Sequence, residues 1–351
     1  MKLSKFNPEM LVLARELRGM TQQEVASAAG FSQAFISQIE AGAREVSDDI
    51  VDRAASALRV PSSFFVQDER YTGFGISLVY YRKRSSALIG HLRRLQAEVN
   101  LHRIHVKRLL RGVDLVTPHG FQLLDIDEHG GSPEDIAIRL RATWMLPIGP
   151  IRNLVSAIEN AGGIVLRFPF GTTDIDAMSQ WPDDMPPLFF LNADAPSDRV
   201  RFSLAHELGH VVMHKMATDD IENEANRFAS EFLMPKRDIA NELIGIDLAR
   251  AAALKPHWRV SMAALIRRAR DLKKITEDRY RDLFISMGRL GIRKREPHDL
   301  PREEPTIIPR IMNIYFSDNG FSMQQMGDLL CWPPDELRPR YFPAGNMRLA
   351  Q

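Results

Sequence analysis

The stretch RFSLAHELGHVVMH, residues 201–214, places two histidines and a glutamate at the spacing of a metal site. Residues four positions apart share one face of an α-helix, so His206 and His210 can bind the same ion. Glu207 directly follows the first histidine and can lie beside the open coordination position of the metal. Apolar residues recur through the stretch at helical spacing. The stretch therefore predicts a zinc site on an amphipathic helix, with hydrolytic chemistry.

A third protein ligand is expected, because catalytic zinc sites commonly have three and leave the fourth position to water. His214 lies about 12 Å along the helix axis from His206 and is rotated off the shared face. We therefore expect His214 to support a ligand or to cap the helix. The next predicted helix, residues 221–235, carries Glu222 and Glu224 on either side of its apolar face. Periodicity leaves both carboxylates open as the third ligand, and both could equally be solvated.

The run RFSLAHELGHVVMH, followed by ENEANRFASEFLMP, resembles the ImmA/IrrE family of bacterial zinc metallopeptidases. The resemblance spans roughly residues 136–300 and is most specific in these two helices. It implies Zn²⁺ as the cofactor, bound by His206, His210 and the glutamate directly before Ala-Asn, which is Glu224 here. It also implies that Glu207 is the catalytic base and that the substrate is a protein, such as another regulator.

A second pattern occupies residues 1–70. Thr21 and Ser32 precede two predicted helices, residues 22–29 and 33–40, and Gly30 lies at the turn between them. Serine and threonine are good N-caps, and this arrangement is the spacing of a helix-turn-helix. The second of these helices turns small and amide side chains outward, and such groups can contact base edges in a major groove. The pattern therefore predicts a small helical DNA-binding domain.

The run TQQEVASAAGFSQAFISQIEAG, residues 21–42, resembles the lambda-repressor-like helix-turn-helix domains of the XRE class of bacterial regulators. The resemblance implies double-stranded DNA as a partner. The implied DNA contacts are Gln22, Gln33, Ser37 and Gln38, with Arg44 expected on phosphate. A homodimer is expected because such proteins commonly read two half-sites.

The composition fits a multidomain protein. A chain of 351 residues is too long for one typical core, so two or three domains are expected. Its net charge is +1, so nucleic-acid affinity must come from local charge. Cys331 is the single cysteine, which excludes an intrachain disulfide. The N-terminal residues show neither a signal peptide nor a membrane span, so a cytoplasmic location is expected.

The sequence divides into four predicted regions. Residues 1–70 form the helix-turn-helix domain, residues 71–132 a basic helical linker, residues 133–300 the metallopeptidase domain with strands at 164–168 and 187–191, and residues 301–351 a tail without assigned chemistry. No internal repeat is expected.

The predicted linker is unusually basic. Residues 81–113 hold nine cations against one glutamate, Glu98. A solvated basic face is the ordinary interpretation, and additional phosphate contacts are the alternative. His102 and His105 are expected at the surface. The nine cations are Arg82, Lys83, Arg84, Arg93, Arg94, Arg103, Lys107, Arg108 and Arg111.

The predicted fold is mainly α, with an α+β zincin-like metallopeptidase domain and an all-α helix-turn-helix domain at the N-terminus. The predicted function is a DNA-binding transcriptional regulator fused to a zinc-dependent endopeptidase. One alternative is a transcription factor whose peptidase-like domain is a non-catalytic sensor or dimerisation platform. Another is a peptidase whose helix-turn-helix recognises protein, since a fold does not dictate a function.

Overall fold

The chain folds into two compact units. In the computed structural model, one unit is Met1–Leu115 with Ile307–Gln351, and the other is Val116–Thr306. The structure describes residues 6–73, 89–113, 120–126, 128, 131–214, 220–293 and 295–342. Both ends of the chain therefore belong to the same unit. The domain boundaries at 70, 132 and 300 stay predictions.

Short helices open the first unit, and their ends follow from local capping. Thr21 accepts a hydrogen bond from the Glu24 amide, and Gly30 ends the second helix with a left-handed φ of 70°. Ser32 caps the third helix. The predicted bounds of the second and third helices are confirmed. The elements are α1 (Pro8–Leu17), α2 (Gln22–Ala29), α3 (Gln33–Glu40), α4 (Asp48–Leu58) and the 3₁₀ turn η1 (Ser62–Val66).

The helix expected to be a basic linker, α6 (Ile89–Leu109), is largely buried. His102 and His105 are 2% and 0% exposed, so the expectation that they lie at the surface is wrong. Arg103 and Lys107 both lie near Glu69, at 3.9 and 3.6 Å. Arg103 and Lys107 therefore interact with a carboxylate of their own unit. Arg82, Lys83 and Arg84 lie outside the described residues. A 3₁₀ turn, η3 (Leu110–Gly112), follows α6.

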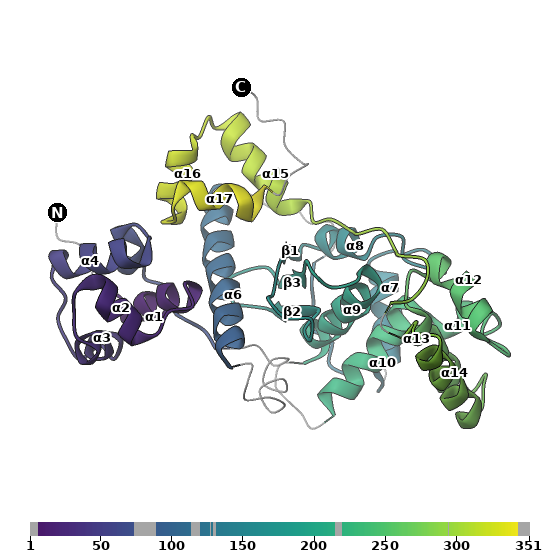
Figure 1. Ribbon diagram of the computed structural model, residues 1–351. Coiled ribbons are helices and arrows are strands. Elements are labelled where there is room, and N and C mark those ends of the chain that lie inside the picture. Colours follow the sequence, from purple (N-terminus) through teal and green to yellow (C-terminus); the bar gives the residue numbers. More distant parts are fainter. Residues whose placement is uncertain are drawn as a thin grey trace. The chain divides into compact units, whose positions relative to one another are not determined.

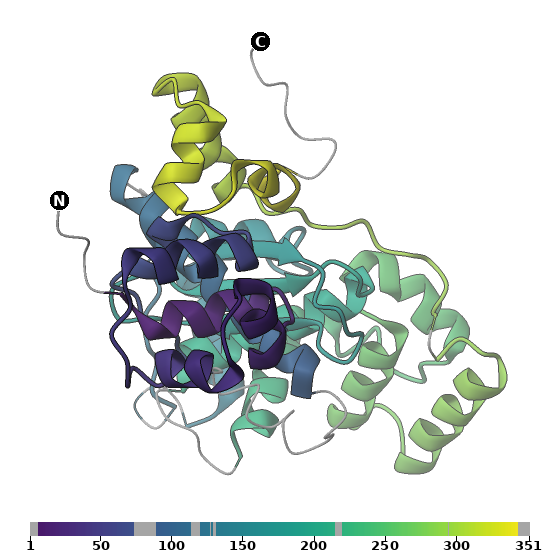
Figure 2. The ribbon, with the colours of Figure 1, turned by 60° about the vertical axis from the view of Figure 1, so that its left-hand side comes forward.

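Residues of the predicted C-terminal tail complete the first unit. Helices α15 and α16 pack against α6 (Figures 1 and 2). The Tyr341 hydroxyl is 2.7 Å from His105 Nδ1, and the Trp332 and Phe64 rings are 5.6 Å apart. These contacts explain why the α6 histidines are buried. The elements are α15 (Ile307–Asn313), the π-helical turn η4 (Ile314–Asp318), α16 (Met323–Leu330) and α17 (Pro334–Tyr341).

A three-stranded sheet and its covering helices form the second unit. The strand order is β1-β3-β2, with β1 parallel and β2 antiparallel to β3. Strand β2 was not predicted, because four residues are too few for a clear alternating pattern. The elements are α7 (Pro133–Thr143), α8 (Leu154–Asn160), β1 (Ile164–Phe168), β2 (Ala177–Gln180), β3 (Leu188–Asn192), α9 (Ser197–Met213), α10 (Ile221–Leu233), α11 (Lys236–Ile239), α12 (Leu248–Trp258), α13 (Met262–Asp271) and α14 (Glu277–Arg289).

Close packing of α9 against α10 depends on Gly209. A Cβ atom there would lie 3.0 Å from Phe228 Cδ1 and 3.4 Å from Ala225 Cα. Such distances leave no room for a larger residue without a shift of α10. Phe228 stacks in turn on Phe232 of the same helix, with centroids 5.3 Å apart. The glycine of the histidine motif therefore lets the two helices approach closely.

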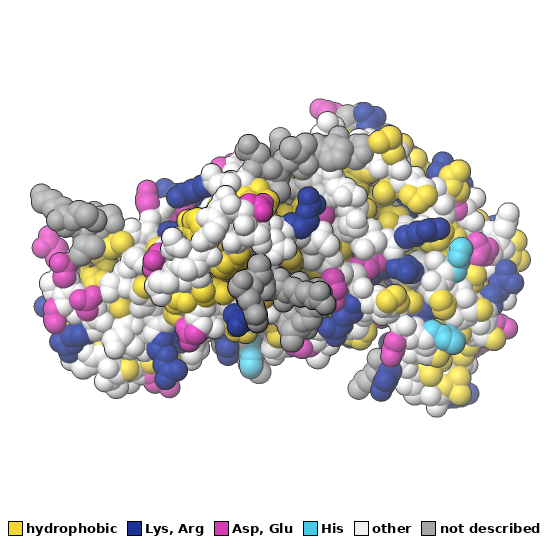
Figure 3. Space-filling model, turned by 90° about the horizontal axis from the view of Figure 1, so that it is seen from above, with side chains coloured by type: hydrophobic (Ala, Val, Ile, Leu, Met, Phe, Trp, Pro, Cys, Tyr) yellow, Lys and Arg dark blue, Asp and Glu magenta, His cyan; other side chains and the backbone are white. Residues whose placement is uncertain are grey.

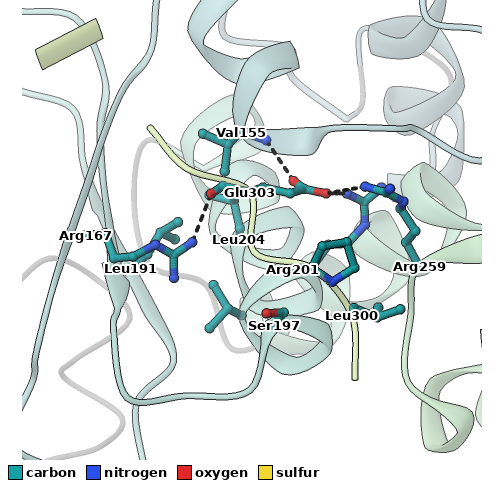
Figure 4. A pocket seen from close by; sticks show the side chains of 11 residues that line it. Val155, Arg167, Leu191, Ser197, Arg201, Leu204, Arg259, Leu300 and Glu303 are labelled. Carbon is teal, nitrogen blue, oxygen red and sulfur yellow. Dashed lines mark hydrogen bonds and ion pairs between the residues drawn. The ribbon is translucent and has the colours of Figure 1, made fainter. Parts of the chain in front are cut away.

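An extended strap, residues 296–306, crosses the second unit without forming a helix or strand. Glu303 makes an ion pair with the buried Arg201 guanidinium and accepts a hydrogen bond of 2.7 Å from the Leu154 amide. Figure 4 shows Glu303 reaching between Val155 and Arg201. The strap is thus fixed by a charge pair that would be costly to break.

The visible surface carries no large region of one charge. Figure 3 shows Lys and Arg side chains interspersed with Asp and Glu, as the net charge of +1 suggests. Within the described residues, no helix combines the length and the apolar character needed to cross a bilayer.

Candidate metal centre

Two imidazoles on α9 point their Nε2 atoms at one position. His206 Nε2 and His210 Nε2 are 3.0 Å apart. Their Nδ1 atoms face other partners, Asn226 Oδ1 at 3.2 Å and His214 Nδ1 at 3.2 Å. Contacts at Nδ1 fix the ring orientation and leave Nε2 for a metal ion. The expected supporting role of His214 agrees with this contact and with its position as the C-cap of α9.

Helix α10 brings one carboxylate to the same position. Glu222 Oε2 lies 3.5 Å from His206 Nε2, and Glu222 Oε1 lies 3.3 Å from His210 Nε2. Tetrahedral zinc with bonds of about 2.0–2.1 Å separates its ligand atoms by about 3.4 Å. The Glu222 Oε1 atom is buried beside His210 Nε2. The two nitrogens and this carboxylate therefore fit a zinc ion.

Glu224, the third ligand that the family resemblance implied, contacts His214 instead. Its Oε2 lies 3.0 Å from His214 Nε2, and the group of possible metal ligands is His206, His210 and Glu222. The orientation of α10 decides between the two glutamates. Residues 222 and 226 share one face of the helix, and Asn226 on that face contacts His206. The structure thus replaces Glu224 by Glu222 in the candidate site.

The protonation of the site reflects its charges. Burial alone would lower the pKa of His206, but its hydrogen bond to the Glu222 carboxylate and the charges of Glu207 and Glu222 together raise it. Hydrogen bonds with His206 and His210 hold the pKa of Glu222 well below its usual range. The carboxylates beside these rings therefore favour a cation at this position.

Glu207 lies beside this group, and a residue of the sheet fixes its side chain. It is 4% exposed, and its Oε2 accepts a hydrogen bond of 2.7 Å from the Ser179 hydroxyl on β2. Because one oxygen is fixed in this way, the carboxylate has a defined orientation. Ser179 could not be predicted, since a lone serine in an unpredicted strand belongs to no motif. Asn226 was also missed, although its i+4 spacing from Glu222 was visible.

The predicted DNA-contacting residues lie together on the first unit. Gln33 Nε2 donates to Gln22 Oε1 at 2.7 Å, so the two amides at the starts of α3 and α2 are paired. Arg44 donates to Gln38 Oε1 at 3.1 Å. Gln33 and Gln38 are exposed, and Ser37 on the same helix is partly exposed. The geometry thus groups the five predicted side chains on and beside α3.

The pocket in Figure 4 is separate from the candidate metal site. It is lined by residues of the N-terminal half of α9, including Arg201, by the strap with Glu303, and by Arg167 of β1 and Arg259 at the end of α12. None of the three candidate metal ligands lines it. Glu303 already pairs with the buried Arg201 guanidinium of this pocket, so the candidate metal site is the one on α9 and α10.

Comparison with known families agrees with this architecture. The second unit contains a metallopeptidase-like domain, and the first contains a helix-turn-helix DNA-binding domain. Specifically, residues 159–270 match the IrrE N-terminal-like domain of the M78 peptidases, and residues 11–65 match a helix-turn-helix domain. No curated protein matches the chain. The predicted fold class and the predicted combination of domains are confirmed.

Proposed function

We propose that this chain is a DNA-binding transcriptional regulator that carries a zinc-dependent endopeptidase, with a protein substrate such as another regulator. The observation that carries the proposal is the convergence of His206, His210 and Glu222 beside Glu207. Two imidazoles and one carboxylate are the ligand set of many catalytic zinc sites. The set leaves one position open, as hydrolysis requires.

Bound zinc would supply an acidified water molecule and polarise the scissile carbonyl. In the proposal, Glu207 takes the proton of that water and then delivers it to the leaving nitrogen. The Ser179 hydroxyl orients the carboxylate by its hydrogen bond of 2.7 Å. His214 holds the His210 ring at its Nδ1 atom, and Asn226 holds the His206 ring at its Nδ1 atom. Each of these residues therefore has a distinct role in one reaction.

The sheet supports an extended peptide as the substrate. In the strand order β1-β3-β2, one edge of β2 pairs with no strand among the described residues. Unpaired backbone groups of an edge strand can bind a peptide by strand addition. Ser179 lies on this strand and contacts Glu207, so a peptide bound there would run close to the proposed base. An unfolded segment of a protein fits this arrangement.

The proposed DNA contacts are Gln22, Gln33, Ser37 and Gln38, with Arg44 on phosphate. The amide pair formed by Gln22 and Gln33 presents fixed donors and acceptors, which suits hydrogen bonding to base edges. A homodimer would place two such surfaces on two half-sites.

The test uses the zinc-loaded full chain and a peptide library made by digesting bacterial lysate. New peptide termini, read by mass spectrometry, are expected with the wild type and with the Glu304→Gln control. Glu207→Gln is expected to lower the cleavage rate by about 10²- to 10⁴-fold while zinc remains bound. Equal cleavage by Glu207→Gln would remove this residue from the mechanism.

The same assay separates the proposal from a non-catalytic role. If zinc binds at about one ion per chain and no new termini form, the peptidase-like domain is a sensor or dimerisation platform. A duplex that the wild type selects from random DNA should then still bind Glu207→Gln. Failure to select any duplex would contradict the DNA-binding part of the proposal.

A further inference from the structure

Helices α16 and α17 repeat the geometry of α2 and α3 at an offset of 301 residues. In both pairs, an eight-residue helix is followed by a left-handed residue, a two-residue link and a second eight-residue helix. Thr21 and Ser322 each close a capping box at the start of the first helix. Gly30 and Cys331 are the left-handed residues, with φ of 70° and 50°. The C-terminal residues therefore form a second helix-turn-helix.

The hydrogen bonds of the turn coincide as well. The Phe31 amide donates to Ala26 O at 2.8 Å, and the Trp332 amide donates to Gly327 O at 3.0 Å. These are equivalent bonds at the same offset, and each closes the turn after its first helix. The absence of an internal repeat, expected from residue identities, is therefore contradicted by the backbone.

The buried positions coincide too. The first helix of each pair buries the same face, and the helix before each pair contributes matching buried residues. The second helices share one buried position, and after it the buried Ile39 and Tyr341 lie one position apart. Val25, Ala26, Ala29 and Ile36 correspond to Met326, Gly327, Leu330 and Leu337, while Met10, Leu11 and Ala14 correspond to Ile311, Met312 and Tyr315.

The positions proposed to contact DNA differ between the two copies. Met323 and two prolines offer no donor to a base edge. Asp335 and Glu336 stand where α3 has Ala34 and Phe35, and carboxylates are repelled by phosphates. Arg338 alone among the four matching residues offers donors, so the second copy is poorly equipped to read base edges. Gln22, Gln33, Ser37 and Gln38 correspond to Met323, Pro334, Arg338 and Pro339.

The second copy contacts the chain's own helices instead. Glu336 makes an ion pair of 2.8 Å with Arg18, the C-cap of α1. Arg18 also donates to Leu58 O and Arg59 O at the end of α4, each at 2.8 Å. The Arg18 guanidinium lies 5.2 Å from the Trp332 ring centroid. One side chain therefore joins α1, α4 and the second copy.

We propose that the second helix-turn-helix is a protein-binding copy that clamps the DNA-reading copy from within the same chain. The first copy reads DNA, and the second holds α1, α4 and α6 in the positions that orient α2 and α3. DNA affinity therefore requires residues 307–342, and each chain presents one reading helix. The proposal rests on the DNA-binding part of the proposed function.

The test uses the full chain and a DNA duplex that the wild type selects from a random-sequence library. Glu336→Arg is expected to lower affinity for this duplex at least tenfold, because it places two cations together. Glu336→Gln, which keeps an oxygen acceptor for Arg18 and adds no cation, is expected to bind this duplex more tightly than Glu336→Arg. Arg338→Ala, on the exposed face of α17, is the matched control and is expected to bind within about twofold of the wild type.

Hydrogen exchange separates the clamp from the DNA-binding assignment. Glu336→Arg should speed amide exchange in α1–α4 and leave α9 and the zinc content unchanged, whether or not the wild type selects a duplex. Unchanged exchange and affinity in Glu336→Arg would overturn the clamp. A tenfold loss of affinity in Arg338→Ala would also overturn it, because α17 would then contact DNA.

Discussion

Two pairs of histidines in this protein have similar helical spacing and opposite surroundings. His206 and His210 on α9 point toward Glu222, a carboxylate from the next helix. His102 and His105 on α6 face Tyr341 and the cation of Arg340, and both are almost completely buried. Spacing on a helix therefore makes a pair of ligands possible, and the neighbouring helix decides whether a metal ion is favoured.

The pKa shifts of these histidines also have opposite directions. Carboxylates raise the pKa of His206 against the effect of burial. Burial, followed by the charge of Arg340, lowers the pKa of His102 and His105 well below the usual range. The charged form of His206 is thus favoured, whereas His102 and His105 stay neutral.

The largest expected effect tests which pair binds metal. His206→Ala and His210→Ala should each reduce zinc from about one ion per chain to near zero. Each variant leaves two protein ligands, and zinc sites of this kind need three. His102→Ala and His105→Ala should retain zinc, even where they destabilise the first unit. Metal analysis of the four proteins measures this, and stoichiometric zinc in both α9 variants would refute the ligand assignment.

The next effect separates the two glutamates of α10. Glu222→Gln should weaken zinc binding at least 100-fold because it removes a ligand. Glu224→Gln should weaken it about 10- to 100-fold, because it removes the partner of His214, which supports His210. Competition with a chelator of known affinity measures both. A larger loss for Glu224→Gln would restore the ligand implied by the family resemblance.

Gly209→Ala tests whether helix packing creates the difference between the pairs. The added Cβ would meet Phe228 at 3.0 Å, so we expect a loss of about 1–3 kcal/mol in the free energy of unfolding, with weaker zinc binding. Gly90→Ala on α6 is the control, since a Cβ there meets nothing within 4 Å. Alanine should be neutral or slightly stabilising at that position. Denaturant unfolding with and without zinc compares the two; equal effects would mean that packing at Gly209 is unimportant.

The smallest effect concerns pH. His102 and His105 stay neutral in the folded protein and take up protons in the unfolded chain. The free energy of unfolding is therefore highest above about pH 6.5 and falls below it. Each should contribute a slope of up to about 1.4 kcal/mol per pH unit below that value. His105→Phe should remove its share of the slope, and His91→Gln, exposed on the same helix, should not. Unfolding of the first unit between pH 5 and 8 measures this, and an unaltered slope in His105→Phe would contradict the assignment.

Much of the fold could be predicted locally. Capping residues and periodicity set α2, α3 and β1 at the bounds that the structure has, because these signals act within a few residues. The positions of His206, Glu207 and His210 followed from one helical turn. Strand β2 and the strap at Glu303 could not be predicted, since pairing and burial by distant residues hold them.

The amino-acid order thus determined the two candidate histidine ligands, the proposed base beside them and the helices that carry the proposed DNA contacts, since these depend on near neighbours along the chain. Tertiary structure decided that Glu222 rather than Glu224 faces the imidazoles, because the crossing of α9 and α10 turns one side of α10 inward. It also decided that α6 is buried and that both ends of the chain share one unit. Contacts between residues hundreds of positions apart leave no periodic trace in the sequence.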